Sequence, residues 1–192
     1  TINGVQATRS NPRHGVLVVD GGIGVDVDAT ININNIANLK AKGHGDHAFG
    51  IGGTDANVNI DNTYIEYVSG GHIQPLFVND EKYGKSEPEG GAAIGGAKVN
   101  ISNSTIVKAE GGSKAAAIGN SYHQSTEVVI TNSELGEIFG GNASAAIGGS
   151  RYASGISTDN KQITKIRIEG STIGNAVGGQ YGAGIGAGYD TH

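Results

Sequence analysis

The chain has 192 residues, of which 34 are glycine and 3 are proline, and its formal net charge is −5. This length fits one domain or two small ones, and the absence of cysteine excludes disulfides, thiolate metal sites and cysteine nucleophiles. Glycine does not recur at every third position, which excludes collagen, and the scattered basic residues argue against a nucleic-acid partner.

The beginning of the chain contains no candidate targeting segment. Its longest apolar run, residues 16–19, is too short for the core of a signal peptide or for a membrane span. Because the first residue is Thr1 rather than Met, we expect the chain to be a processed product or a fragment of a larger solenoid.

A repeat extends along most of the sequence. The pair Ile-Gly begins at Ile23, Ile51, Ile94, Ile118, Ile147 and Ile185. Four stretches also align without gaps: VNIDNTYIEYVSGG, VNISNSTIVKAEGG, VVITNSELGEIFGG and IRIEGSTIGNAVGG, which begin at Val58, Val99, Val128 and Ile166. An imperfect copy begins at Ile31. Without the inserts at 72–91 and 149–165, the repeat unit has about 24 residues, and residues 1–192 are predicted to form one domain.

Each repeat unit contains three predicted strands. In the first, Val58 and Ile60 alternate with Asn59 and Asp61, which is typical of a strand with one buried face. A residue that tolerates a left-handed turn follows: Asn62, Asn103, Asn132 or Gly170. The second strand is centred on Ile65, Ile106, Leu135 or Ile173. A Gly-Gly corner then leads to a third strand, A-A-I-G or a variant of it.

These units predict an all-β parallel β-helix of about six coils without a substantial helix. Equivalent residues should stack into ladders, with Ile94, Ile118 and Ile147 in one buried column. If alternation continues through the third strand, Ala93 and Ala117 point outward. The prediction is then a bare strip of small residues, which either reflects tight packing or admits a ligand.

The V-x-I-x-N-S-x-I…GG…A-A-I-G unit, over residues 23–190, resembles the right-handed pectin-lyase-like β-helices of bacterial extracellular proteins. This group includes adhesin-like surface repeats, lacto-N-biosidase-type glycoside hydrolases and phage tailspikes. The resemblance implies a right-handed helix and an extracellular or cell-surface location. It also implies a glycan-recognising part of a carbohydrate-active or cell-surface protein. No catalytic motif of these families is found in the chain.

Polar and aromatic residues follow three of the Ile-Gly pairs and are the candidate ligand-binding residues. They are Tyr122, His123, Arg151, Tyr152 and Tyr189. Tyrosine rings stack on apolar sugar faces, and the neighbouring polar groups bind hydroxyls or anions. The predicted ligand is an oligo- or polysaccharide. The alternative is an exposed tyrosine ladder that covers apolar edges.

Catalysis is left open by the sequence. Glycoside hydrolysis requires two carboxyl groups, and the candidates are Asp55, Asp159 and Asp190, with Glu81 and Glu87 opposite. No spacing marks any two of them as a pair. A polysaccharide lyase, which we favour less, would use His123 and Arg151.

We predict no metal site and no cofactor. His44, Asp46 and His47 have ligand chemistry, but polar residues at a glycine-rich corner favour solvent exposure. Calcium at Asp26 and Asp28 is left open, although a solvated strand face is favoured there.

Two further functional expectations come from the repeat. The alternative to glycan recognition is a purely structural stalk or adhesin segment without a small ligand. After Ile185 and Gly186 the usual V-x-I strand is missing, so we expect further coils or a second chain to cover this end.

Overall fold

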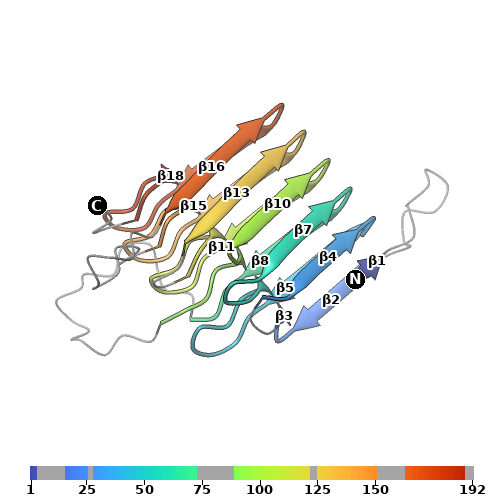
Figure 1. The fold of residues 1–192 in the computed structure, drawn as a ribbon, viewed down its shortest axis with the longest axis horizontal. Coiled ribbons are helices and arrows are strands. Elements are labelled where there is room, and N and C mark those ends of the chain that lie inside the picture. Colours follow the sequence, from blue (N-terminus) through green and yellow to red (C-terminus); the bar gives the residue numbers. More distant parts are fainter. Residues whose placement is uncertain (4–15, 26–27, 73–88, 122–124, 151–162, 189–192) are drawn as a thin grey trace.

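The computed structural model describes residues 1–3, 16–25, 28–72, 89–121, 125–150 and 163–188, and their strands form three sheets (Figure 1). The first sheet contains β1 (Ile2–Asn3), β4 (Thr30–Asn34), β7 (Asn57–Asp61), β10 (Lys98–Ser102), β13 (Thr126–Thr131) and β16 (Thr164–Glu169). The second contains β2 (Val16–Asp20), β5 (Asn38–Lys42), β8 (Tyr64–Ser69), β11 (Thr105–Glu110), β14 (Glu134–Phe139) and β17 (Thr172–Val177). The third contains β3 (Ile23–Gly24), β6 (Ile51–Gly52), β9 (Ile94–Gly95), β12 (Ile118–Gly119), β15 (Ile147–Gly148) and β18 (Ile185–Gly186).

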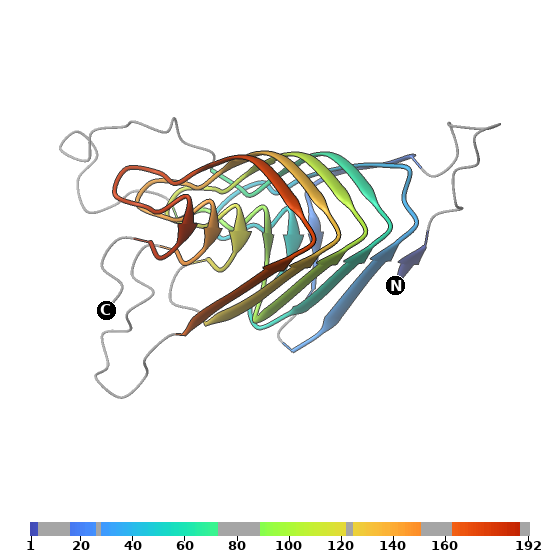
Figure 2. The same ribbon diagram turned by 90° about the horizontal axis from the view of Figure 1, so that it is seen from above.

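Each strand pairs in parallel with its equivalent in the next repeat, as in β7 with β10 and β10 with β13. This arrangement is a parallel β-helix, and the prediction of the fold class is confirmed. Figure 2 shows the coils stacked one behind another. Among the described residues there is no helix, and hence none that could span a membrane.

The first sheet follows the predicted alternation. Val58 and Ile60 are buried, whereas Asn59 and Asp61 between and after them are half-buried on the outer face. Alternation arises because successive side chains of a strand point to opposite faces. The apolar row therefore enters the core, and the polar row forms an outer surface.

The second sheet has a different spacing. In β11, the buried Ile106 and Ala109 are separated by the outward Val107 and Lys108. In β5 the buried residues are Leu39 and Ala41, only two positions apart, and the β5–β8 pairing shifts register between Leu39 and Lys40. The shift accommodates one more residue in each strand from β8 onward.

The third sheet carries the predicted isoleucine column. Ile94 pairs with Ile118, Ile118 pairs with Ile147, and all three are fully buried. The predicted bare outer strip is wrong, because Ala93, Ala117 and Ala146 are also fully buried and belong to the hydrophobic core. These strands contain only Ile and Gly, so the alternation does not extend back into the Ala-Ala turn before them.

The corner between the first and second sheets adopts the predicted left-handed conformation. The φ angles of Asn62, Asn103, Asn132 and Gly170 are 47°, 49°, 48° and 56°. Asparagine and glycine adopt this region at low cost, which explains why three copies have asparagine here and the fourth has glycine.

The coil formed by β16, β17 and β18 has an exposed apolar edge. Ile185 is 46% exposed, whereas the equivalent Ile147 in the preceding coil is fully buried. Ile166 and Ile168 of β16 are only partly buried against the core. The coil β13–β15 is therefore covered by a neighbouring coil on both sides. In the described part of the chain, the coil β16–β18 is covered on one side only.

Candidate functional site

The structure describes one of the eight residues predicted to bind or act on a ligand. Asp55 lies in an exposed turn with a φ of 56°, three residues after the end of β6. The remaining seven lie outside the described residues: Tyr122, His123, Arg151, Tyr152, Asp159, Tyr189 and Asp190. Their grouping at one corner stays a prediction.

The histidine-rich segment after β5 does not form one cluster of ligands. His44 contacts Asp20, Asp46 contacts His72 Nε2 at 2.9 Å, and His47 Nε2 lies 3.7 Å from Glu89 Oε2. Within the described residues no group of three or more histidine or acidic side chains is arranged for a metal. Asp28 is exposed with a φ of 61°, and Asp26 lies outside the described residues.

The most regular polar surface lies on the outer face of the first sheet. We define the amide face as Asn32, Asn34, Asn59, Asp61, Asn100 and Ser102. These residues occupy the outward positions of β4, β7 and β10, and they pair in register as two columns, Asn32–Asn59–Asn100 and Asn34–Asp61–Ser102. All six are half-buried, so they are held by the sheet and still reach solvent.

The first column is a continuous chain of amide hydrogen bonds. Asn59 Nδ2 donates to Asn32 Oδ1 at 2.8 Å, and Asn100 Nδ2 donates to Asn59 Oδ1 at 2.7 Å. The parallel strands place equivalent residues about 4.8 Å apart, which lets each amide reach the next. The amides are therefore fixed in one orientation along the stacking axis.

These bonds use only part of each amide. A side-chain amide offers two N–H donors and an oxygen with two lone pairs. Asn59 uses one N–H and one lone pair within the column. One N–H and one lone pair remain for a group outside the protein, and the same pair of functions repeats on each coil of the column.

The second column carries the only negative charge of the amide face. Asp61 Oδ1 accepts hydrogen bonds from Ser102 Oγ at 2.7 Å and from Asn103 Nδ2 at 2.9 Å. These bonds hold the pKa of the Asp61 carboxyl below its usual range, the bond from Ser102 contributing most. Asp61 is thus ionised and part of the hydrogen-bonded surface.

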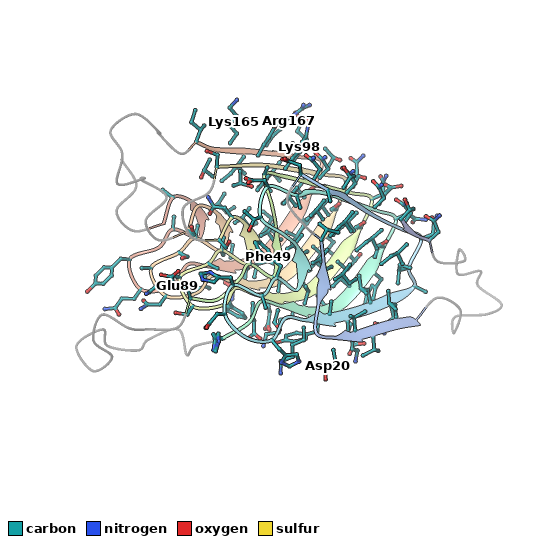
Figure 3. The ribbon with its side chains drawn as sticks, turned by 60° about the horizontal axis from the view of Figure 1, so that its bottom comes forward. Asp20, Phe49, Glu89, Lys98, Lys165 and Arg167 are labelled. Carbon is teal, nitrogen blue, oxygen red and sulfur yellow. The ribbon has the colours of Figure 1, made fainter. Side chains whose placement is uncertain are left out.

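Beyond β10 in the same sheet, the outward residues at this position are no longer asparagines. Val129 continues the Asn100 position in β13, and Arg167 continues it in β16. Arg167 binds Glu169 through two hydrogen bonds of 2.7 Å. Figure 3 shows Lys98, Lys165 and Arg167 pointing away from this sheet. The amide column therefore ends at β10.

A second polar cluster lies on the outer face of the second sheet. Tyr67 Oη donates to Glu110 Oε2 at 2.6 Å, and Lys108 Nζ lies 2.8 Å from Glu110 Oε1. Lys108 Nζ also lies 5.9 Å from the centre of the Tyr67 ring and 5.7 Å from that of Phe139. Both Glu110 oxygens are already occupied within the protein, so this cluster fastens β8, β11 and β14 together.

The amide face was not among the predicted sites, although its signal is present in the sequence. Asn32, Asn59 and Asn100 occupy the same outward position of three copies. Alternation predicts that these residues point outward, and the repeat predicts that they stack. The hydrogen bonds between them could be established only from the structure.

Comparison of the chain with protein-family models, curated proteins and solved structures found no match.

Proposed function

We propose that this β-helix recognises glycan and that the amide face is its binding surface. The observation that carries the proposal is the Asn32–Asn59–Asn100 column, in which oriented amides repeat once per coil. A sugar hydroxyl both donates and accepts a hydrogen bond. The free N–H and lone pair of each amide match that chemistry.

The spacing of the column supports an extended polysaccharide. Equivalent amides recur about every 4.8 Å along the stacking axis, close to the advance per sugar unit in an extended chain. One amide can therefore meet one sugar, and a chain several sugars long makes several equivalent contacts.

The charge of the amide face favours a neutral glycan. Its only ionised side chain is Asp61, and Ser102 and Asn103 already bind that carboxylate. An acidic sugar at the second column would meet a like charge. Lys98 lies on the outer face of β10, two residues before Asn100, so the preference for neutral over acidic polysaccharides is expected to come from the second column.

This proposal places the chain in an extracellular or cell-surface protein that is either carbohydrate-active or adhesive. The candidates for glycoside hydrolysis include Asp159 and Asp190, which lie outside the described residues. Binding at the amide face does not depend on catalysis, so the two can be tested apart.

The test first measures binding of the chain to an array of neutral and acidic glycans. A polysaccharide that the array shows to be bound is then used in affinity electrophoresis, which compares the variants. Asn59→Ala interrupts the column at its centre, and Asn32→Ala removes its end. We expect both variants to bind at least about tenfold more weakly, which corresponds to a loss of about 1.4 kcal/mol. Melting temperatures report any loss of folding.

The matched control is Asn175→Ala, because Asn175 is an exposed asparagine on β17 of the second sheet. Its glycan binding should equal that of the unsubstituted chain. The proposal fails if the unsubstituted chain retains no glycan, or if the two column variants bind as well as the control.

The exposed edge of the coil β16–β18 favours a second, structural role. Ile185, 46% exposed, lies where every preceding isoleucine from Ile51 to Ile147 is covered by a neighbouring coil. We propose that another β-coil, from a second chain or from a longer form of the same protein, stacks on this edge. This role is that of a solenoid segment and is compatible with glycan binding on the side.

A further inference from the structure

The described part of the solenoid has two edges, which lie at opposite ends of the stack (Figure 1). We define the leading edge as the side of the coil β1–β3 that faces away from β4–β6, with Ile2, Leu17 and Ile23. We define the trailing edge as the side of the coil β16–β18 that faces away from β13–β15, with Ile168, Ile173 and Ile185. Among the described residues no strand pairs with either edge.

The two edges carry the same three apolar positions of the repeat. Pairing in register connects Ile2 to Ile168 through one column of isoleucines. Two further columns begin at Leu17 and Ile23 and end at Ile173 and Ile185. Between the edges every member of these columns is buried, whereas the six end residues are only partly buried or exposed. A second copy whose leading edge lay on the trailing edge would continue all three columns.

Backbone hydrogen bonds at the isoleucines of the third sheet run in one direction along the stack. Ile147 N donates to Gly184 O of the following coil at 3.1 Å, and every earlier isoleucine of the column, from Ile23 onward, also donates to the following coil. Beyond the trailing edge, the next donor of this row is Ile185 N. The acceptor that continues the row is Gly22 O of a second copy, since Gly22 precedes the isoleucine of the leading edge.

Two rows at the corners that flank the second sheet run in the same direction. Asn132 N donates to Glu169 O at 3.0 Å, and Gly140 N donates to Val177 O at 2.9 Å, both in the following coil. The leading-edge acceptors at the equivalent positions are Asn3 O and Asp20 O. The leading edge thus supplies a carbonyl at each position where these rows require one.

These rows and columns favour a coil in one orientation as the occupant of the trailing edge. A single extended peptide pairs with one of β16, β17 and β18 and leaves the other two uncovered. Two trailing edges placed face to face would run their strands antiparallel, because turning a coil over reverses its strands. The rows of donors and the three columns continue only when a leading edge meets a trailing edge.

We propose that the trailing edge of one copy of this chain binds the leading edge of a second copy, so that all three sheets continue across the contact. This inference names the partner in the structural role proposed above and rests on that role, but it is independent of glycan binding. A head-to-tail contact leaves one edge of each copy free, and such contacts build open-ended filaments. The assembly therefore grows as the concentration of the chain rises.

The test uses two variants of the intact chain, each of which blocks one edge at the same repeat position. Ile23→Lys places a charge on the leading edge, and Ile185→Lys places one on the trailing edge. Lysine at an edge extends into water, but burial of its charge between two coils is costly. By sedimentation velocity, we expect the mean mass of the unsubstituted chain to grow with concentration. Each variant alone should sediment as a monomer.

An equimolar mixture of the two variants distinguishes a head-to-tail contact from any other. The Ile23→Lys copy keeps its trailing edge, and the Ile185→Lys copy keeps its leading edge, so the mixture should form a dimer and nothing larger. The control is Glu134→Lys, an exposed substitution on the side of the solenoid, which should assemble like the unsubstituted chain. Thermal melting of each variant reports whether it is folded.

A cysteine pair tests the register without blocking either edge, because the chain contains no cysteine. Asn3 and Glu169 are exposed at equivalent positions of the two edges. Neighbouring strands place equivalent residues about 4.8 Å apart, within the range of about 4.4–6.8 Å that a disulfide spans. On oxidation, the double variant Asn3→Cys with Glu169→Cys should form a ladder of covalent oligomers, whereas Asn3→Cys alone should form none.

Three results would overturn the proposal. An unsubstituted chain that is monomeric at all concentrations would leave a longer form of the protein as the occupant of the trailing edge. An Ile23→Lys variant that is folded and assembles like the unsubstituted chain would show that the trailing edge binds a different surface, while the structural role stands. A double cysteine variant that assembles without forming the covalent ladder would show that the copies meet in another register.

Discussion

The hydroxyl of Tyr67 is bound to Glu110 on the outer face of the second sheet. Burial, followed by the hydrogen bond to Glu110, raises the pKa of Tyr67 to about 12. A tyrosine in an unfolded chain titrates near pH 10. Because the folded state holds this proton more tightly, the contribution to stability is complete below about pH 10 and is lost as the pH rises toward 12.

We therefore predict that Tyr67→Phe reduces the loss of folding stability at alkaline pH. Phenylalanine keeps the ring near Lys108 but has no proton to lose. As the pH is raised from 9 to 11, the urea concentration at the midpoint of unfolding should decrease in the unsubstituted chain. It should decrease less steeply in the variant. Tyr64→Phe, on the exposed face of the same strand, is the control and should behave like the unsubstituted chain. Identical slopes for Tyr67→Phe and the unsubstituted chain would contradict the prediction.

Single residues show what a repeat can and cannot predict. The outward position of Asn59 follows from alternation, and the left-handed turn at Asn62 follows from its residue type. The contact between Tyr67 and Glu110 does not follow from either rule. These residues are not at equivalent repeat positions, so their meeting depends on side-chain conformations across neighbouring strands. The same holds for the three histidine pairs, which join residues from inserts and corners of different length.

At the scale of elements, the glycine column beside the isoleucine column sets how closely the coils approach. Gly119 has a φ of 147°, and a Cβ at this position would overlap the carbonyl oxygen of Gly148 in the next coil. That oxygen accepts the hydrogen bond from Asn120 N at 3.3 Å. A side chain here would therefore oppose both the backbone conformation and the pairing of β12 with β15.

We predict that Gly119→Ala destabilises the fold by more than about 3 kcal/mol, because strain of about 1–3 kcal/mol adds to a clash with backbone. The matched control is Gly21→Ala, where φ is 123° but a Cβ would meet nothing within 4 Å. This control carries the strain without the clash and should lose about 1–3 kcal/mol. Urea unfolding measures both. A Gly119→Ala variant no less stable than the control would show that the coils can separate locally.

Strands and corners were largely predictable, since alternation and turn residues are local properties. Three strands per repeat, the left-handed corner and the buried Ile118 column are confirmed. The outward strip of alanines is wrong for a physical reason. A strand of two residues has too few positions to sustain alternation, and the residues before it turn into the core instead.

At the scale of the whole molecule, each coil is stabilised by its neighbours. Ile118 is covered by Ile94 and Ile147, whereas Ile185 has a partner on one side in the described residues. The free energy of burying such a side chain is about 1.5–3 kcal/mol. An uncovered edge with several apolar residues therefore favours association with another coil.

We predict that Ile185→Lys reduces self-association of the chain while leaving it folded. Sedimentation velocity over a range of concentrations should show larger species for the unsubstituted chain than for the variant. The control is Glu134→Lys, an exposed substitution in β14 on the side of the solenoid. If the unsubstituted chain sediments as one monomeric species at all concentrations, stacking of a second copy on this edge is excluded.

The inserted segment between β8 and β9 has a consequence for engineering. Residues 70–93 separate these strands, whereas only 111–117 separate the equivalent β11 and β12. Nevertheless β8 pairs with β11 and β9 with β12 in the same register as the shorter coils. The entropy of closing a loop grows slowly with its length. This corner is thus a natural place to graft foreign peptides, which the solenoid would display without any change in its hydrogen-bonded ladders.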